Sequence, residues 1–162
     1  MSVDTLSVCI EDAVLQEMTS LGESGYPEEV AGFLLGSSQA NKVVVQHFVR
    51  LANAMQPEAR HYSYQVSATD WQGGEATAKK LTLELVGIFH THPDHPSLPS
   101  LFDLEFALPN FIYIIATIRQ RSLTSMQAWK LCEDRSRFDS CLLQLEDAEL
   151  LKQLTRPASS DI

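Results

Sequence analysis

The chain has 162 residues, of which 44% are hydrophobic, so its length and composition suit one globular domain with a core of its own. Its formal net charge of −9 argues against binding to nucleic acid or anionic lipid, because such binding relies on Lys and Arg. The three cysteines form no Cys-x-x-Cys pair, and no stretch reaches the roughly 20 apolar residues that span a bilayer. We therefore expect a cytoplasmic protein with free thiols that is neither secreted nor membrane-spanning.

The first third of the chain predicts a strand, a helix and a β-hairpin. Residues 7–10 suit a short strand, and the apolar side chains that follow recur at helical spacing until Gly22 and Gly25 end the helix. Residues 27–36 (PEEVAGFLLG) form a short apolar run that suits a buried strand, and residues 42–49 (KVVVQHFV) are rich in β-branched side chains. The turn residues between these two strands indicate a hairpin.

The next segment predicts a loop and a second helix. Residues 52–66 show no periodicity, so we expect a loop that ends in a short extended piece. Residues 68–83 favour a helix with Thr69 or Asp70 as its cap, although two adjacent glycines weaken it by about 2 kcal/mol relative to alanine.

The second half of the chain predicts more strands than helices. The pattern indicates a strand over 83–93, a short helix over 100–108, and further strands over 111–118, 126–133 and 138–145. The helices precede or separate groups of strands without regular alternation. This order favours a mixed α/β fold of the α+β type over a doubly wound one.

The end of the chain differs from the rest in composition. We expect a folded domain over residues 1–146 and a tail over residues 147–162. The tail contains one possible helical turn, and its last residues, RPASSDI, predict partial disorder because they are mostly small and polar.

Three of the five histidines lie in the segment HTHPDHPSLPSLFD, residues 90–103. Alternate side chains of a strand point the same way, and the Cα atoms of His90 and His92 would lie about 6.5 to 7 Å apart, so both imidazoles can converge on one ion. Pro93 favours extended backbone at His92 and stiffens the loop that follows. The spacing therefore indicates a metal site.

A third metal ligand is needed, because a catalytic zinc ion typically has about three protein ligands and one open position. Asp103 is the candidate, since a helix capped by Ser100 would carry it in the first turn, on a side that faces the preceding loop. The same Ser-x-x-Asp pattern also resembles a capping box that only satisfies N–H groups of the helix. Alone it favours a cap, and next to His-x-His-Pro it favours a ligand.

The whole segment resembles the signature of the JAMM (MPN+) metalloprotease family, His-x-His-Pro-x6-Ser-x2-Asp, and every fixed position is filled. The family also has an upstream Glu-x-x-Gly pattern, which residues 29–32 (EVAG) match. Judged by the order of elements, the resemblance covers roughly residues 7–145. It implies a curved mixed β-sheet flanked by helices, the JAMM/MPN architecture, which is cytidine-deaminase-like.

The resemblance also implies roles for individual residues. One zinc ion per chain would be held by His90, His92 and Asp103, although iron or another divalent metal suits the same ligand types. Glu29 would be the general base, and Ser100 would donate its hydroxyl to the tetrahedral oxyanion. In a strand Glu29 and its neighbour face opposite ways, so we expect Glu28 to be solvated.

For other polar residues the sequence allows two interpretations each. His61 and Tyr62, which follow Arg60, could line a groove for an extended peptide tail, or they could anchor their loop to the core. Arg60 itself could bind a carboxylate, or it could be an exposed arginine that binds nothing. His95 could support a metal ligand or touch substrate, or it could be an exposed turn residue. We expect His47 to be a packed strand histidine.

The resemblance implies hydrolysis of an isopeptide or peptide bond after the C-terminal Gly-Gly of ubiquitin or a ubiquitin-like protein. The compact outline, the stretch NAMQP at 53–57 and the segment HTHPDHPSLPS look like prokaryotic members that act on ubiquitin-like sulfur carriers. Two alternatives are an amidase or cell-wall peptidase that acts on small peptides, and a non-catalytic MPN scaffold, which normally lacks these ligands.

Overall fold

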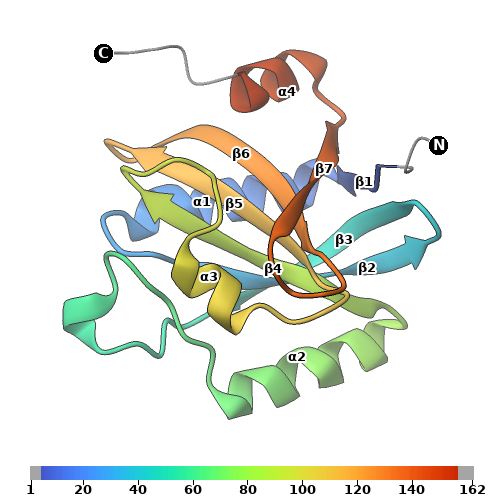
Figure 1. Cartoon of the computed structure of the whole chain (residues 1–162), viewed down its shortest axis with the longest axis horizontal. Helices are drawn as coiled ribbons and strands as arrows, with labels where there is room; N and C mark the ends of the chain where they lie inside the picture. Colours follow the sequence, from blue (N-terminus) through green and yellow to red (C-terminus); the bar gives the residue numbers. More distant parts are fainter. Residues whose placement is uncertain (1–4, 157–162) are drawn as a thin grey trace.

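A computed structural model describes residues 5–156 and shows one curved, mixed sheet with helices packed around it (Figure 1). Within these residues the strands are β1 (Ser7–Ile10), β2 (Ala31–Gln39), β3 (Lys42–Leu51), β4 (Glu84–Pro93), β5 (Ile112–Arg119), β6 (Ser122–Leu131) and β7 (Phe138–Leu145). The helices are α1 (Asp12–Gly25), the 3-10 helix η1 (Pro57–Ala59), α2 (Ala68–Leu81), α3 (Leu101–Phe106) and α4 (Ala148–Thr155). The expected α+β class is confirmed.

The sheet closes on itself in the order β1-β3-β2-β4-β5-β6-β7. Closure depends on the short strand β1, which runs parallel to two neighbours: Ser7 pairs with Lys42 of β3 on one side and with Leu142 of β7 on the other. A register shift next to Gly36 bends β2 against β3, and a Cβ at that position would lie 1.8 Å from the carbonyl oxygen of Val44. Glycine is therefore required where the sheet curves.

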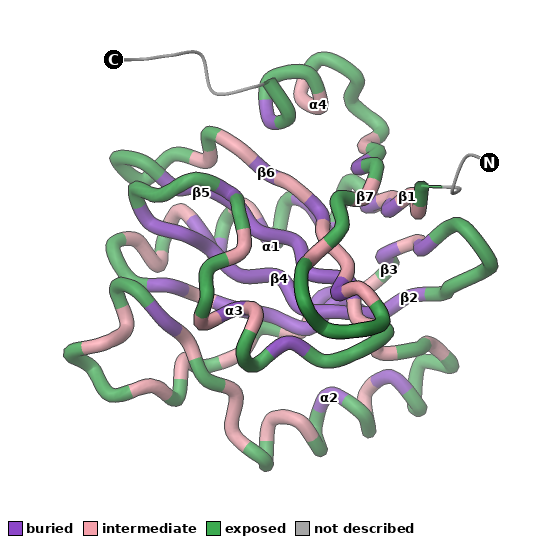
Figure 2. The backbone as a smooth tube through the Cα atoms, in the orientation of Figure 1, coloured by how far each residue is buried: buried purple, intermediate pink, exposed green. Residues whose placement is uncertain are grey.

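Both faces of the sheet are covered. The larger core cluster joins the strands to Val14 and Met18 of α1 and to Leu154 of α4. The smaller cluster lies on the side of α2 and includes Phe33, whose neighbour Leu34 belongs to the larger one. Adjacent strand residues face opposite sides, so the central strands are buried on both, as Figure 2 shows for β4 and β5. No helix within residues 5–156 is long and apolar enough to cross a membrane.

Two of the predicted boundaries in the first half of the chain were wrong. β2 begins at Ala31 rather than at residue 27, because the N–H of Glu28 donates to the carbonyl of Gly25 and prolongs the end of α1 as a turn. The cap of α2 is Ser67, whose hydroxyl accepts the N–H of Asp70 at 3.1 Å, rather than Thr69 or Asp70.

The second half also differs from the prediction in detail. β6 begins at Ser122, four residues before the predicted start, because a two-residue turn at Gln120 and Arg121 connects it directly to β5. Both turn residues have positive φ, as a tight hairpin turn requires, but neither is the Gly or Asn that signals one. Beyond the predicted folded domain, α4 forms over Ala148–Thr155, and the residues from Pro157, where disorder was predicted, lie outside the described part. The division at residue 146 stays a prediction.

Candidate metal centre

The site is built at the carboxyl end of β4. Every residue of this strand from Val86 to Pro93 is buried, and the strand lies between β2 and β5. His90 is opposite Ala31 of β2, so the chain that leads into β2 runs past the two histidines. Val30 fixes this contact twice: its N–H donates to the hydroxyl of Thr91, and its carbonyl accepts the N–H of Thr91, each at 3.0 Å.

Three side chains meet within hydrogen-bond distance. The Nε2 atoms of His90 and His92 lie 3.3 Å apart, and the Asp103 carboxylate reaches both, with Oδ1 3.2 Å from His90 and Oδ2 3.1 Å from His92. All three residues are buried. Ligand atoms held at about 2.0 to 2.1 Å from a tetrahedral zinc ion lie about 3.3 to 3.4 Å from one another. The separations of these nitrogen and oxygen atoms are therefore close to those of a ligand set.

Glu29 is the fourth member of the cluster. One of its carboxylate oxygens and a ring nitrogen from each of His90 and His92 all lie within 4.8 Å of one another. Glu29 is only 5% exposed, whereas Glu28 is exposed, as expected. The group of Glu29, His90 and His92 could hold a metal ion, and Asp103 lies against the same two histidines.

Asp103 forms the capping box and also contacts the histidines. Its N–H donates to the hydroxyl of Ser100 at 3.0 Å, and its Oδ2 accepts the N–H of Ser100 at 2.8 Å. The same Oδ2 lies 3.1 Å from His92. The sequence left open whether Asp103 is a helix cap or a metal ligand. The two roles are compatible, because the cap fixes the carboxylate in the position where it meets both imidazoles.

The two histidines are oriented in different ways. His92 donates its Nδ1–H to the carbonyl of Pro96 at 2.8 Å, which leaves Nε2 as the nitrogen with a free lone pair. His90 instead packs against the ring of Tyr64, with 4.7 Å between the ring centroids. Within the described residues, Nδ1 of His90 has no hydrogen-bond partner although it is buried.

Hydrogen bonds behind the site hold the loop that contains Pro96. The hydroxyl of Thr117 donates to the carbonyl of His95 at 2.7 Å and lies 2.8 Å from the hydroxyl of Ser97. The indole N–H of Trp129 donates to the carbonyl of Ser97 at 3.0 Å. Thr117 and Trp129 belong to β5 and β6, so the sheet itself anchors the residues on each side of the carbonyl that orients His92.

Thr117→Val should therefore weaken the binding of a divalent metal ion by about 10- to 100-fold, the usual effect of losing support behind a ligand. Valine keeps the shape of Thr117 and removes both hydroxyl interactions, so the carbonyl of Pro96 is held less firmly, although Trp129 still binds the loop next to it. Affinity is measured by competition with a chelator. Thr155→Val, an exposed change on α4 that makes the same substitution, is the control. Equal affinities in the two variants would contradict this role of Thr117.

Burial and charge shift the pKa values of the cluster. Burial raises the pKa of Glu29 to about 8; the charge of His92 lowers it and that of Asp103 raises it. Burial also acts to raise the pKa of Asp103, but the charge of His90 and hydrogen bonds from both histidines and Ser100 hold it well below its usual range. Burial acts to lower the pKa of His92, yet its bonds to Asp103 and Pro96 raise it. A positive charge next to the carboxylates of Glu29 and Asp103, on a histidine or on a metal ion, is therefore favoured.

The loop over 52–66 positions Glu29. The carbonyl of Arg60 accepts the N–H of Glu29, and the amide of Asn53 donates to the carbonyl of Glu29 at 3.0 Å and to that of Ser63 at 2.9 Å. The guanidinium of Arg60 donates to the carbonyl of Met55 at 2.8 Å, inside the same loop. Arg60 therefore binds a backbone carbonyl of its own loop, and its contact with substrate stays a prediction.

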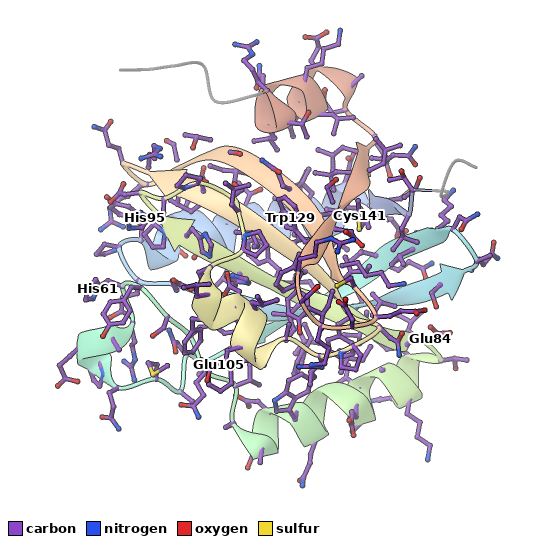
Figure 3. All side chains as sticks on the ribbon, in the orientation of Figure 1. His61, Glu84, His95, Glu105, Trp129 and Cys141 are labelled. Carbon is purple, nitrogen blue, oxygen red and sulfur yellow. The ribbon has the colours of Figure 1, made fainter. Side chains whose placement is uncertain are left out.

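The other predicted substrate residues lie apart from the hydrogen bonds of the cluster. His61 and Tyr62 are exposed and pack edge to face, 4.6 Å between ring centroids, and both His61 and His95 can be located in Figure 3. His95 is exposed, and its carbonyl is the group that Thr117 binds. His47 is a half-buried residue of β3. Contact of His61, Tyr62 or His95 with substrate stays a prediction.

Two residues of the site did not emerge from the sequence. The sequence singled out Asn53 only as part of the stretch at 53–57. Its amide donates to the carbonyls of Glu29 and Ser63 and accepts the N–H of Met55, and these three hydrogen bonds depend on the fold. Tyr64, which stacks on His90, gives no signal in the sequence because an aromatic residue in an irregular loop is compatible with many environments.

Comparison with known proteins identifies the family. The model of prokaryotic homologs of the JAB domain matches residues 11–132. The chain belongs to this family. The resemblance to JAMM/MPN proteins seen in the sequence is thereby confirmed, and the ligand motif lies inside the part of this JAB-domain protein that matches.

Individual relatives agree with the assignment. A desampylase of Haloferax volcanii is 26% identical over 114 residues, which cover 70% of this chain and 79% of the relative. The solution structure of a protein from Salinibacter ruber is 33% identical with a TM-score of 0.63 and covers 93% of this chain and 92% of its own. That of DSY2949 from Desulfitobacterium hafniense has a TM-score of 0.75 at 20% identity, covers 86% and 93%, and supports the fold alone.

Proposed function

We propose that this JAB-domain protein is a zinc-dependent peptidase that hydrolyses the amide bond after the C-terminal Gly-Gly of a ubiquitin-like or sulfur-carrier protein. The observation that carries the proposal is the convergence of two imidazoles and the Asp103 carboxylate at 3.1 to 3.3 Å, with Glu29 buried beside them. Similarity to a desampylase supports this choice of reaction. Ser100 and Glu29, which match the JAMM signature, would supply the other two groups needed for hydrolysis, the oxyanion donor and the general base.

His90, His92 and Asp103 would hold the ion, because two imidazoles and one carboxylate leave a fourth tetrahedral position open. When bound, zinc supplies Lewis acidity, which polarises a carbonyl and lowers the pKa of water toward about 7. Iron binds the same types of donor atom, so ferrous iron is the alternative to zinc that has to be tested. The hydrogen bond to the carbonyl of Pro96 leaves Nε2 of His92 available, so this nitrogen would be the one that binds the ion.

Glu29 accepts the proton of the attacking water and passes it to the leaving amine. Its burial, which raises the pKa to about 8, suits both steps, because such a carboxyl binds a proton and releases it again near neutral pH. The ionised form needed at the start is favoured by positive charge at the cluster.

Ser100 stabilises the oxyanion that forms on the scissile carbonyl. Its oxygen accepts the N–H of Asp103, so its own O–H is free to point toward the site, and the residue is exposed. A donor well placed in this way contributes about 3 to 4 kcal/mol to transition-state stabilisation. Glycines next to the bond allow the substrate backbone to approach the cluster closely, since they carry no Cβ.

Metal removal tests this proposal. Chelation should abolish cleavage of a sulfur-carrier fusion that continues beyond its Gly-Gly, and about one equivalent of zinc per chain should restore it, with ferrous iron tested in parallel. The matched control substrate carries Ala-Ala in place of Gly-Gly. Turnover of short peptides without fusion cleavage would favour an amidase or cell-wall peptidase. A zinc-loaded protein that cleaves neither would favour a non-catalytic scaffold.

A further inference from the structure

An apolar pocket adjoins the metal cluster. It has a volume of about 400 Å³ and is lined by residues of α2, α3 and the loop that leads into α2. Its walls include the aromatic residues Tyr64, Trp71, Phe102, Phe106 and Tyr113. Asp103 forms one wall and is the sole charged side chain among the residues described as lining the pocket. Pockets of this size and composition are typical of sites for small apolar groups.

Two residues that line the pocket also contact the cluster. Asp103 contacts both imidazoles at 3.1 to 3.2 Å, and Tyr64 stacks on His90. An amide bond placed at the cluster for hydrolysis would therefore lie next to the opening of the pocket. Residues of an extended peptide advance by about 3.3 Å each, so side chains two or three residues away from that bond can reach it.

We propose that this pocket binds a bulky apolar side chain of the substrate, in a position flanking the Gly-Gly pair. The inference rests on the proposed function and deepens it, because it adds a second recognition element to the glycines. Glycine itself has no side chain to fill the pocket, so the occupant comes from a neighbouring residue. The carboxylate of Asp103 disfavours an acidic side chain, and the predominantly aromatic and aliphatic walls favour an apolar one.

The rim of the pocket has the exposure expected of a surface that is covered on binding. Phe106 is 62% exposed and Leu108 is 39% exposed, although both are large and apolar. Phe106 stacks on Phe102, with 4.7 Å between their ring centroids, so it is held in place while its outer side faces water. Contiguous exposed apolar side chains beside a site usually mark an interaction surface.

The test compares Gly-Gly fusions that carry Leu, Phe, Ala or Asp at the two positions before the glycines or the two positions after the cleaved bond. For the zinc-loaded wild type, kcat/KM should be at least about 10-fold higher for Leu or Phe than for Asp at one of these positions, the range that a hydrophobic pocket provides. Phe106→Ala should reduce this preference through KM. Leu101→Ala, on the same helix and 87% exposed but outside the pocket, should behave as wild type.

Binding without hydrolysis separates this proposal from the proposed function. Trp71 lines the pocket, so its fluorescence should change when a peptide with Leu at one of these four positions binds the holoenzyme and change less with Asp at that position, and Trp71→Phe should lose the response. If this preference is found although no fusion is cleaved, the pocket stands and the proposed reaction fails. Cleavage with equal kcat/KM for Leu, Phe and Asp at all four positions would overturn the pocket proposal.

Discussion

Glu29→Gln is expected to lower kcat for a Gly-Gly fusion by about 100- to 10,000-fold, the usual contribution of a general base. Glutamine has nearly the same shape and can keep its place in the cluster, but it cannot accept the proton of the attacking water. The zinc content should stay at the wild-type level, because Asp103 and the two histidines remain. The measurements are steady-state kinetics and elemental analysis on the same samples.

Glu28→Gln is the matched control for this variant. Glu28 is the exposed neighbour of Glu29, so its substitution removes the same charge at the same point of the chain without entering the site, and kcat should stay within about twofold. A different result is informative: loss of zinc in Glu29→Gln would mean that Glu29 is itself a ligand, as the group of Glu29, His90 and His92 allows.

Asp103→Asn should reduce bound zinc from about one ion per chain to near none and remove activity with it, because a neutral amide is a far weaker ligand for zinc than a carboxylate. The helix α3 should persist, since the amide oxygen of asparagine can still accept the N–H of Ser100 and the hydroxyl of Ser100 can still cap the helix. Zinc is measured by elemental analysis and the fold by circular dichroism.

Asp94→Asn is the control for this second variant, because Asp94 lies in the segment between β4 and α3 but is exposed and accepts a hydrogen bond from Tyr26 at 2.7 Å. It should retain zinc. A zinc-loaded, active Asp103→Asn protein would show that the Asp103 carboxylate is only a helix cap, and the metal centre would then consist of Glu29 and the two histidines.

The same carboxylate should affect stability in chelator-treated protein. The pKa of Asp103 is held below its usual range, so the folded state binds a proton at this group less readily than the unfolded chain does. Its contribution to stability is present above about pH 4, the ordinary pKa of aspartate, and is lost as the pH falls. Asp103→Asn should therefore show a smaller decrease in melting temperature on acidification.

The parts of the site that could be predicted from the sequence are those that depend on local geometry. His90 and His92 face the same way because a strand alternates its side chains, and Ser100 with Asp103 forms a helix start because their spacing is that of a capping box. All four lie within residues 90–103. The fold class followed from the order of elements in the same way.

Element boundaries depended on contacts that the pattern does not contain. The strand predicted from residue 27 begins at Ala31, since a turn at the end of α1 uses the N–H of Glu28, and the prediction that Glu29 alternates with Glu28 within a strand was therefore wrong in its reason. Glu29 is nevertheless buried and Glu28 exposed. Glu29 lies beside the histidines because β2 pairs with β4, and the hydrogen bonds between Val30 and Thr91 fix this pairing.

Local sequence patterns were therefore enough to predict the α+β class, the family resemblance and the segment that carries the candidate ligands, because each rests on periodicity or on short fixed spacings. The folded chain was needed to see four features: the closure of the sheet through β1, the packing of Tyr64 on His90, the bond from Thr117 to the carbonyl of His95, and the apolar pocket beside Asp103. Each of these joins residues that are distant along the chain. Such contacts are selected by the packing of the whole core, which no local pattern records.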